Sequence, residues 1–239
     1  MKGVVARFRH GPKAGEAISE EGLEVLKAQG KEFARWMLSQ KADAKSLKKR
    51  GVDLSLFFSG VPRAGTSAVE FTKGFSEAMH GANVRTNTNA LRQDPSLVGW
   101  KNADVVAWKR LLERAKGDES KALKMLQRRP SLVPTAESPA EQGARVELWA
   151  AEHTLEVARS NSGPIKVIVG FGHEPVMGSA RGTAHPGEKG SRYLVVPGRR
   201  AITTPGGLIT HVSDEGIATL HEMHHAGNRK HEINYVGHI

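Results

Sequence analysis

The stretch "GVVARFRHGPKAG" (residues 3–15) joins an apolar run to a polar turn. Residues 4–8 have the length and apolar density of a short buried strand. Arg9, His10 and Gly11 follow directly, and Pro12 then turns the chain. An arginine and a histidine at the end of a buried strand become candidates for chemistry if other strands bring partners to the same edge.

Apolar runs and helical periodicity alternate along most of the chain. They predict strands at 4–8, 52–60, 81–91, 165–175 and 206–212, a hairpin at 193–204, and helices at 18–37, 63–78 and 138–159. Ser19 is the expected N-cap of the first helix. Strands separated by helices predict an α/β fold with a doubly wound, mostly parallel sheet flanked by helices. Ligands bind beyond the carboxyl ends of the strands in such sheets.

The length of 239 residues fits one large α/β domain. We expect this domain to cover residues 1–220, with a helical insertion at about 95–137. A final helix and a His-rich tail over 221–239 are expected to close the chain. Lys48, Lys49 and Arg50 are interpreted as part of a solvated loop.

Composition narrows the classes of function. The formal net charge of +10 favours anionic partners such as phosphorylated metabolites, nucleic acid or acidic proteins. There is no cysteine, which excludes disulfides, thiolate catalysis and Cys-ligated zinc. Aromatic residues make up 5% of the chain, so a mainly aliphatic core is expected. The N-terminal apolar stretch is too short for a signal peptide, and no run is long enough for a membrane span. A cytoplasmic protein is therefore expected.

Three predicted strand ends carry chemically useful groups. Arg9 and His10 follow the first strand, Ser59 and Arg63 follow the second, and His173 with Glu174 follows a later one. A phosphoryl group carries nearly two negative charges, which arginine can bind with a bidentate fork. A neutral imidazole can attack phosphorus if its other ring nitrogen donates to a fixed acceptor, such as a backbone carbonyl of the following turn.

These motifs, taken in order, resemble the histidine phosphatase superfamily, also called phosphoglycerate-mutase-like. The resemblance is carried by "RHG" (9–11), "SGVPRAGTSA" (59–68), "ESPAEQGARV" (137–146) and "GHEP" (172–175). It implies that His10 accepts the phosphoryl group, and that Arg9, Arg63 and His173, with Gly11, bind it. Ser67 stands where the family usually has threonine, and a structural role is expected for it. No cofactor or metal is implied.

The proton donor is left open by the sequence. The family often places a glutamate after the third strand, where "LRQDPSLVG" (91–99) has Gln93 and then Asp94. Asp94 is the first candidate and Glu174 the second, and a relative without a dedicated acid is a further possibility. "GHEP" also resembles the small phosphohistidine phosphatases of bacterial signalling relays, for which a good leaving group can suffice.

A rival motif lies in "LHEMHHAGNRKH" (220–231). His221, Glu222 and His225 match the zinc-peptidase pattern H-E-x-x-H, and His231 stands where a third ligand would be. On a helix, His221 and His225 would lie one turn apart and could chelate one metal ion. The Met-turn that accompanies the longer motif is missing.

The leading interpretation is a metal-independent phosphatase that forms phospho-His10 on a phosphorylated small molecule or phosphoprotein. Neither nucleic acid nor a membrane is expected as a partner. The alternatives are a phosphoglycerate-type mutase, a zinc metallopeptidase using the HEMHH segment, and an inactive relative that binds anions. A mutase is disfavoured because "RHGPKAGEA" (9–17) lacks the Glu-Ser that usually follows "RHG" in mutases. The sequence determines neither the substrate nor the oligomeric state.

Overall fold

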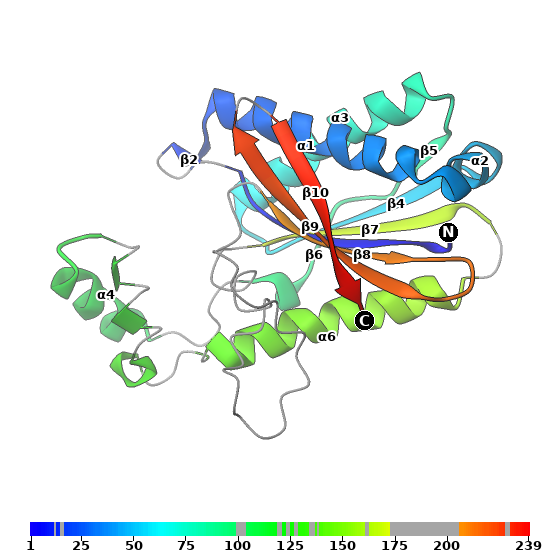
Figure 1. Ribbon diagram of the computed structural model, residues 1–239. Coiled ribbons are helices and arrows are strands. Elements are labelled where there is room, and N and C mark those ends of the chain that lie inside the picture. Colours follow the sequence, from blue (N-terminus) through cyan, green and yellow to red (C-terminus); the bar gives the residue numbers. More distant parts are fainter. Residues whose placement is uncertain are drawn as a thin grey trace.

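The computed structural model places a mixed sheet between two helical layers (Figure 1). It describes residues 1–11, 13–14, 17–98, 104–118, 121–122, 125–126, 129–133, 137, 139–160, 163–172, 206–227 and 230–239. The elements, with η for a 3₁₀ turn, are β1 (Gly3–Arg9), β2 (Lys13–Ala14), β3 (Ala17–Ile18), α1 (Glu20–Ser39), α2 (Lys41–Arg50), β4 (Val52–Phe58), α3 (Pro62–Gly81), β5 (Thr86–Thr88), β6 (Arg92–Gln93), η1 (Pro95–Leu97), α4 (Val105–Arg114), η2 (Pro130–Leu132), α6 (Pro139–Ala158), β7 (Ile165–Gly172), β8 (Gly207–Val212), β9 (Ala218–Gly227) and β10 (Lys230–His238).

The main sheet of the described chain has eight strands in the order β10-β9-β8-β1-β7-β4-β5, with β6 also paired to β4. β1, β7, β4, β5 and β6 pair in parallel. β8, β9 and β10 extend the sheet in antiparallel fashion beyond β1. In Figure 1, α1, α2 and α3 cover one face and α6 covers the other. The expected mostly parallel sheet flanked by helices is confirmed, and the antiparallel wing is an addition to it.

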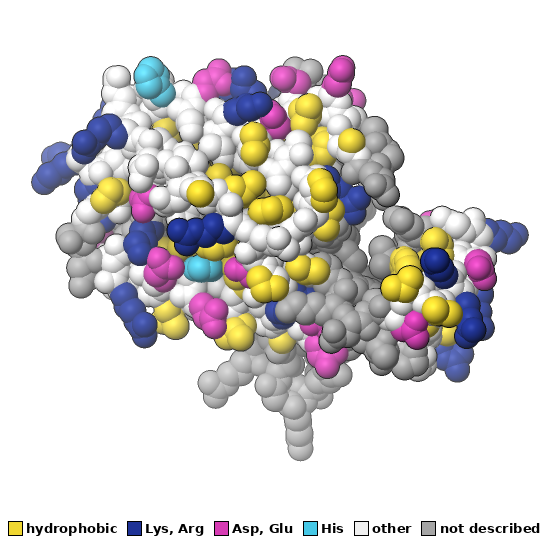
Figure 2. All heavy atoms as spheres, turned by 180° about the vertical axis from the view of Figure 1, so that it is seen from behind, with side chains coloured by type: hydrophobic (Ala, Val, Ile, Leu, Met, Phe, Trp, Pro, Cys, Tyr) yellow, Lys and Arg dark blue, Asp and Glu magenta, His cyan; other side chains and the backbone are white. Residues whose placement is uncertain are grey.

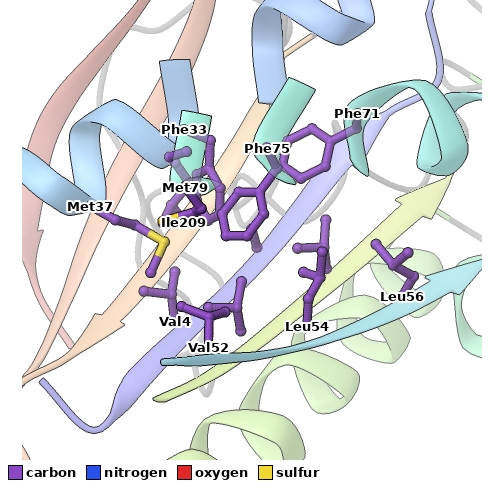
Figure 3. Close-up of a cluster of buried hydrophobic side chains, with 14 of the residues drawn as sticks. Val4, Phe33, Met37, Val52, Leu54, Leu56, Phe71, Phe75, Met79 and Ile209 are labelled. Atoms are coloured by element: carbon purple, nitrogen blue, oxygen red, sulfur yellow. The ribbon is translucent and has the colours of Figure 1, made fainter. Parts of the chain in front are cut away.

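The main core lies between the sheet and the α1–α3 layer (Figure 3). Five of the seven phenylalanines gather there, and their rings contact one another: Phe8, Phe33, Phe71, Phe75 and Phe171. Fully buried aromatic rings contribute large apolar areas and edge-to-face contacts. The expectation of a mainly aliphatic core therefore holds for the α6 side, where Trp149 packs among aliphatic residues, but not for this side.

α1 and α3 pack in close contact, which fixes the position of the two helices relative to each other. A Cβ atom added at Gly30 of α1 would collide with the backbone carbonyl of Phe71, and one at Gly74 of α3 would collide with that of Lys27. Only glycine allows two helix backbones to approach this closely. α1 begins where predicted, since the Ser19 hydroxyl accepts a hydrogen bond from the Gly22 N–H at 3.0 Å.

The segment between η1 and α6 forms a lobe of its own, which confirms the predicted helical character around α4. It has a small separate core of Leu111, Ala115, Ala122, Leu126 and Val133. Seen from behind in Figure 2, the lobe stands to one side of the main body and exposes both hydrophobic and basic side chains. In Figure 1 it lies at the end of the molecule where β1 ends.

Two predictions of secondary structure are wrong. The expected loop at Lys48, Lys49 and Arg50 is the last turn of α2. The expected C-terminal helix and tail are instead the strands β9 and β10, which pair with each other and, through β8, with the rest of the sheet. The predicted hairpin at 193–204 lies outside the described residues. Within the described ranges, no helix is long and apolar enough to cross a membrane.

Candidate functional site

The carboxyl ends of the parallel strands meet at one edge of the sheet. Arg9 pairs with Gly172 and Phe58 pairs with Phe171, so β1, β7 and β4 end level with one another. The backbone N–H of His10 donates to the Gly172 carbonyl at 3.1 Å, and that of Ser59 donates to the Phe171 carbonyl at 3.0 Å. The N–H of Asp94 donates to the Phe58 carbonyl at 2.8 Å. His10, Ser59 and Asp94 thus all lie along this edge.

The His10 imidazole is held in one tautomer. Its Nδ1 lies 2.9 Å from the carbonyl oxygen of Gly11, in a buried hydrogen bond. A carbonyl can only accept, so Nδ1 carries a proton, and in the neutral ring the lone pair is therefore on Nε2. His10 as a whole residue is 8% exposed, so it is buried but not completely enclosed. This is the backbone-carbonyl contact that the sequence argument required of a histidine nucleophile.

The turn after His10 is tied to the start of α3 through Ser67. The Gly11 N–H donates to the Ser67 hydroxyl at 3.1 Å, and that hydroxyl donates to the Arg63 carbonyl at 2.8 Å. Ser67 is fully buried. One hydroxyl therefore links the turn of the candidate nucleophile to the backbone of Arg63, which is a positioning role of the kind expected for it.

Positive charge gathers at this edge. Arg9 is the last residue of β1 and Arg63 is the second residue of α3, and both are half-buried. α3 has no side-chain N-cap and no acidic residue in its first turn. The N-terminus of a helix carries a partial positive charge and favours anions. Arg9, Arg63 and this helix end therefore bring positive charge to the edge of the sheet where His10 lies.

Asp94 has acceptor contacts that the sequence did not reveal. Its Oδ1 accepts from the Ser96 N–H at 2.7 Å and so caps η1. Its Oδ2 accepts from the Trp149 indole N–H at 2.9 Å, which ties it to α6. Asp94 thus lies at the expected edge, and both of its oxygens take part in the local framework.

Arg145 on α6 is an organising residue that sequence reasoning missed. Its guanidinium donates to the carbonyls of Pro95, Ser96 and Val98 and forms a bidentate pair with Glu137. It therefore clamps both ends of the insertion beside Asp94. Both Arg145 and Glu137 lie in the stretch "ESPAEQGARV" that carries part of the family resemblance, but nothing in that stretch indicates that the two residues pair.

The contact with Gln93 explains why residue 60, the first of the two glycines in "SGVPRAGTSA", is a glycine. Gly60 has φ of +79° and lies against the Gln93 side chain, where an added Cβ would collide with the amide. A left-handed backbone here lets the chain turn from β4 into α3 while Gln93 packs on top. His173 and Glu174 follow directly on Gly172 in sequence but lie outside the described residues.

The rival zinc motif fails on geometry. His221, Glu222 and His225 lie on β9, not on a helix. Four residues along a strand span about 13 Å, so His221 and His225 cannot bind one metal ion together, and Glu222 points to the opposite face from both. His225 does face His231 across β10, with ring centroids 5.1 Å apart. Within the described ranges, no three His, Cys, Asp or Glu residues are grouped closely enough to hold a metal.

His221 is instead packed as a structural side chain. Its ring lies edge-on to Trp36 of α1 and to Tyr235 of β10, with centroids 5.0 and 5.6 Å away. Burial, helped by the nearby His211, lowers the pKa of His221 to about 4. The ring is therefore neutral near neutral pH, as suits a position between two aromatic rings.

Comparison with known proteins gives matches in structure only. No family model matches the chain, and no curated protein matches it. Among solved structures, it is similar to a mycobacterial glucosyl-3-phosphoglycerate phosphatase at 14% identity, covering 98% of both chains with a TM-score of 0.47. It is similar to a Plasmodium falciparum phosphoglycerate mutase at 10% identity, covering 98% of this chain and 99% of the other with a TM-score of 0.41. A Hafnia alvei phytase matches at 12% identity, over 92% and 83% of the two chains, with a TM-score of 0.42. At these values the function has to be argued from the chain's own residues.

Proposed function

We propose that this protein is a phosphatase of the histidine phosphatase superfamily, which hydrolyses a phosphorylated small molecule or phosphoprotein through phospho-His10. The observation that carries the proposal is the Nδ1 hydrogen bond of His10 to the Gly11 carbonyl at the carboxyl end of β1. It leaves the lone pair on Nε2, which is what nucleophilic attack on phosphorus requires. The ordered motifs that resemble the superfamily support the same role.

The reaction has two displacements. In the first, Nε2 of His10 bonds to phosphorus while the bond from phosphorus to the ester oxygen breaks; the leaving oxygen takes the electron pair and receives a proton from a general acid or, for a good leaving group, from water. In the second, water attacks the phosphorus of phospho-His10, the P–N electron pair returns to Nε2, a proton of the attacking water passes to the conjugate base of that acid or to bulk water, and inorganic phosphate leaves. The proton stays on Nδ1 throughout because the Gly11 carbonyl holds it.

We assign Arg9, at the end of β1, and Arg63, at the start of α3, to neutralising the phosphoryl group in both steps. Charge on the equatorial oxygens develops in the transition state, and pre-placed cations stabilise it without rearrangement. The Ser67 hydroxyl links the backbone of Arg63 at the start of α3 to the turn that follows His10. We assign His173 to the same role on its motif alone.

The test is hydrolysis of p-nitrophenyl phosphate in the presence of EDTA. Wild-type protein should release p-nitrophenol at a rate that changes less than about twofold on addition of the chelator, because none of the proposed steps uses a metal. Loss of activity in EDTA that zinc restores would contradict the metal-independent mechanism. No release from this ester or from a panel of phosphorylated metabolites would contradict the phosphatase and favour an inactive anion-binding relative.

The proton donor can be identified by comparing substrates whose leaving groups differ in their need for a proton. Because both oxygens of Asp94 accept framework hydrogen bonds, we propose that Asp94 orients η1 and Trp149 and that Glu174 is the remaining candidate acid. Asp94→Asn should then slow hydrolysis of an aryl and an alkyl phosphate by the same factor. It should also lower the free energy of unfolding by about 1–3 kcal/mol, because an amide N–H₂ replaces one of two acceptors.

Kinetics on p-nitrophenyl phosphate and glycerol phosphate, with urea unfolding, provide the measurement. A loss of about 100-fold or more on the alkyl ester alone would assign the proton to Asp94, since only a poor leaving group needs an acid. Glu152→Gln, an exposed carboxylate on α6, is the matched control and should change neither rate.

A further inference from the structure

The edge strand β10 offers a surface on the side of the sheet away from β4. In the described part of the chain, β10 pairs only with β9 and ends the sheet. Lys230, Glu232, Asn234 and Tyr235 are exposed along it. An open strand edge presents unpaired N–H and C=O groups that can pair with another strand.

The central part of β10 is regular, although both of its ends are not. Its pairing with β9 is interrupted between Lys230 and His231 and again between Tyr235 and Gly237. Irregularities of this kind twist an edge and limit the length that can pair. The stretch His231–Tyr235 lies between them and can accept a straight partner strand of about five residues.

A cavity of about 440 Å³ lies beside this regular stretch. One wall is formed by four residues of α1, among them Arg35 and Trp36, and the other by residues 231–234 of β10. His231, Ile233 and Tyr235 share the face of β10 that looks toward α1, since they pair with His225, Met223 and His221 of β9. Ile233 packs against the main core, so the floor of the cavity is partly apolar.

Tyr235, one of these five residues, has a side chain that could fill the cavity of a second copy. Tyr235 is 54% exposed, although it lies on the face of β10 that His231 and Ile233 share. In an antiparallel pair of two β10 strands centred on Ile233, Tyr235 of one copy lies opposite His231 of the other, beside the cavity. Ile233 then meets Ile233, and Glu232 meets Asn234 on the other face, where an amide can donate to a carboxylate.

We propose that the protein forms a two-fold dimer in which β10 pairs with β10 of a second copy, centred on Ile233, with each Tyr235 inserted into the other copy's cavity between α1 and β10. An exposed ring and a cavity on one segment can satisfy each other twice under a two-fold axis, which is how a closed, isologous interface is built. A foreign peptide strand would fill the cavity but would leave Tyr235 exposed.

The proposed interface is small. Five residues of β10 and four of α1 line it in each copy, against about 20–30 residues a side in a standard stable interface. We therefore expect a weak, concentration-dependent dimer. Sedimentation velocity from about 5 to about 500 µM should show the mass rise from 25.9 kDa towards twice that value.

Matched substitutions distinguish association through this interface from non-specific association. Tyr235→Glu should weaken self-association at least about tenfold, because a charge cannot enter the cavity without loss of hydration. Leu155→Glu on α6, at the same 54% exposure, should leave self-association unchanged. A wild-type protein that stays monomeric over the whole range, or an equal effect of the two substitutions, would overturn the proposal.

The absence of cysteine allows a direct test of register. Ile233→Cys places one thiol on the proposed two-fold axis, where the two Cβ atoms would be about 5 Å apart. A short thiol-specific cross-linker should join two copies through this position, and Leu148→Cys on α6 should not cross-link under the same conditions. Cross-linking at 148 but not at 233, in variants whose circular dichroism matches wild type, would place the contact elsewhere and reject the β10 pairing.

Discussion

Replacing His10 by alanine is expected to lower kcat/KM for p-nitrophenyl phosphate by at least about a thousandfold. Without the imidazole no P–N bond can form, and direct attack by water must replace two easier displacements. Loss of a nucleophile costs enzymes about three to six orders of magnitude in kcat. The turn after residue 10 should survive, because Gly11 is held by Ser67 and residue 10 is held by the Gly172 carbonyl through backbone groups.

The comparison for this prediction is His80→Ala, an exposed histidine near the end of α3, which should retain wild-type activity. Circular dichroism and the urea midpoint show whether each variant is folded. A His10→Ala protein that is folded and keeps more than about a tenth of the wild-type rate would remove His10 as nucleophile. Phosphoryl transfer would then have to be assigned to another residue.

Part of the candidate site could be predicted from the sequence because the ends of the parallel strands can be recognised in it. Apolar runs that stop at Arg9-His10, at Ser59 and at Gly172 mark the same edge of a parallel sheet whatever the details of packing. The tautomer of His10 also followed from chemistry, since a nucleophilic imidazole needs an acceptor at its other nitrogen. What the sequence could not supply were the partners from distant segments, namely Trp149 for Asp94 and Arg145 for both ends of the insertion.

The C-terminal strands show why the rest could not be predicted. His221 and His225 are four residues apart, and this spacing puts two side chains on one face both in a helix and in a strand. Thr219 near the start of the segment 218–227 and Gly227 at its end are compatible with either structure and do not decide between the two. Pairing with β8 decides it, because Met223 and Leu220 become buried on opposite faces only when the chain is extended. The pairing with β8 therefore determined the secondary structure of this segment, against the helix that the H-E-x-x-H motif suggested.

Replacing Arg63 by alanine is expected to lower kcat/KM by about a hundredfold to a thousandfold with little loss of stability. The catalytic part follows from removing one preorganised cation from the developing phosphoryl charge. The stability part follows from the helix dipole, because a positive side chain in the first turn of α3 is slightly unfavourable in the absence of an anion. The two measurements together distinguish an anion-binding residue from a residue that only holds the fold.

Arg63→Lys refines this result, since lysine keeps the charge and loses the bidentate fork. Its kcat/KM should fall between wild type and Arg63→Ala, and inhibition by inorganic phosphate should weaken in the same order. Arg35→Ala on α1, whose side chain is 67% exposed, is the control and should leave both quantities unchanged. If Arg63→Ala instead lowered the urea midpoint strongly and left kcat/KM per folded molecule intact, the arginine would serve the start of α3 and the anion site would have to be built without it.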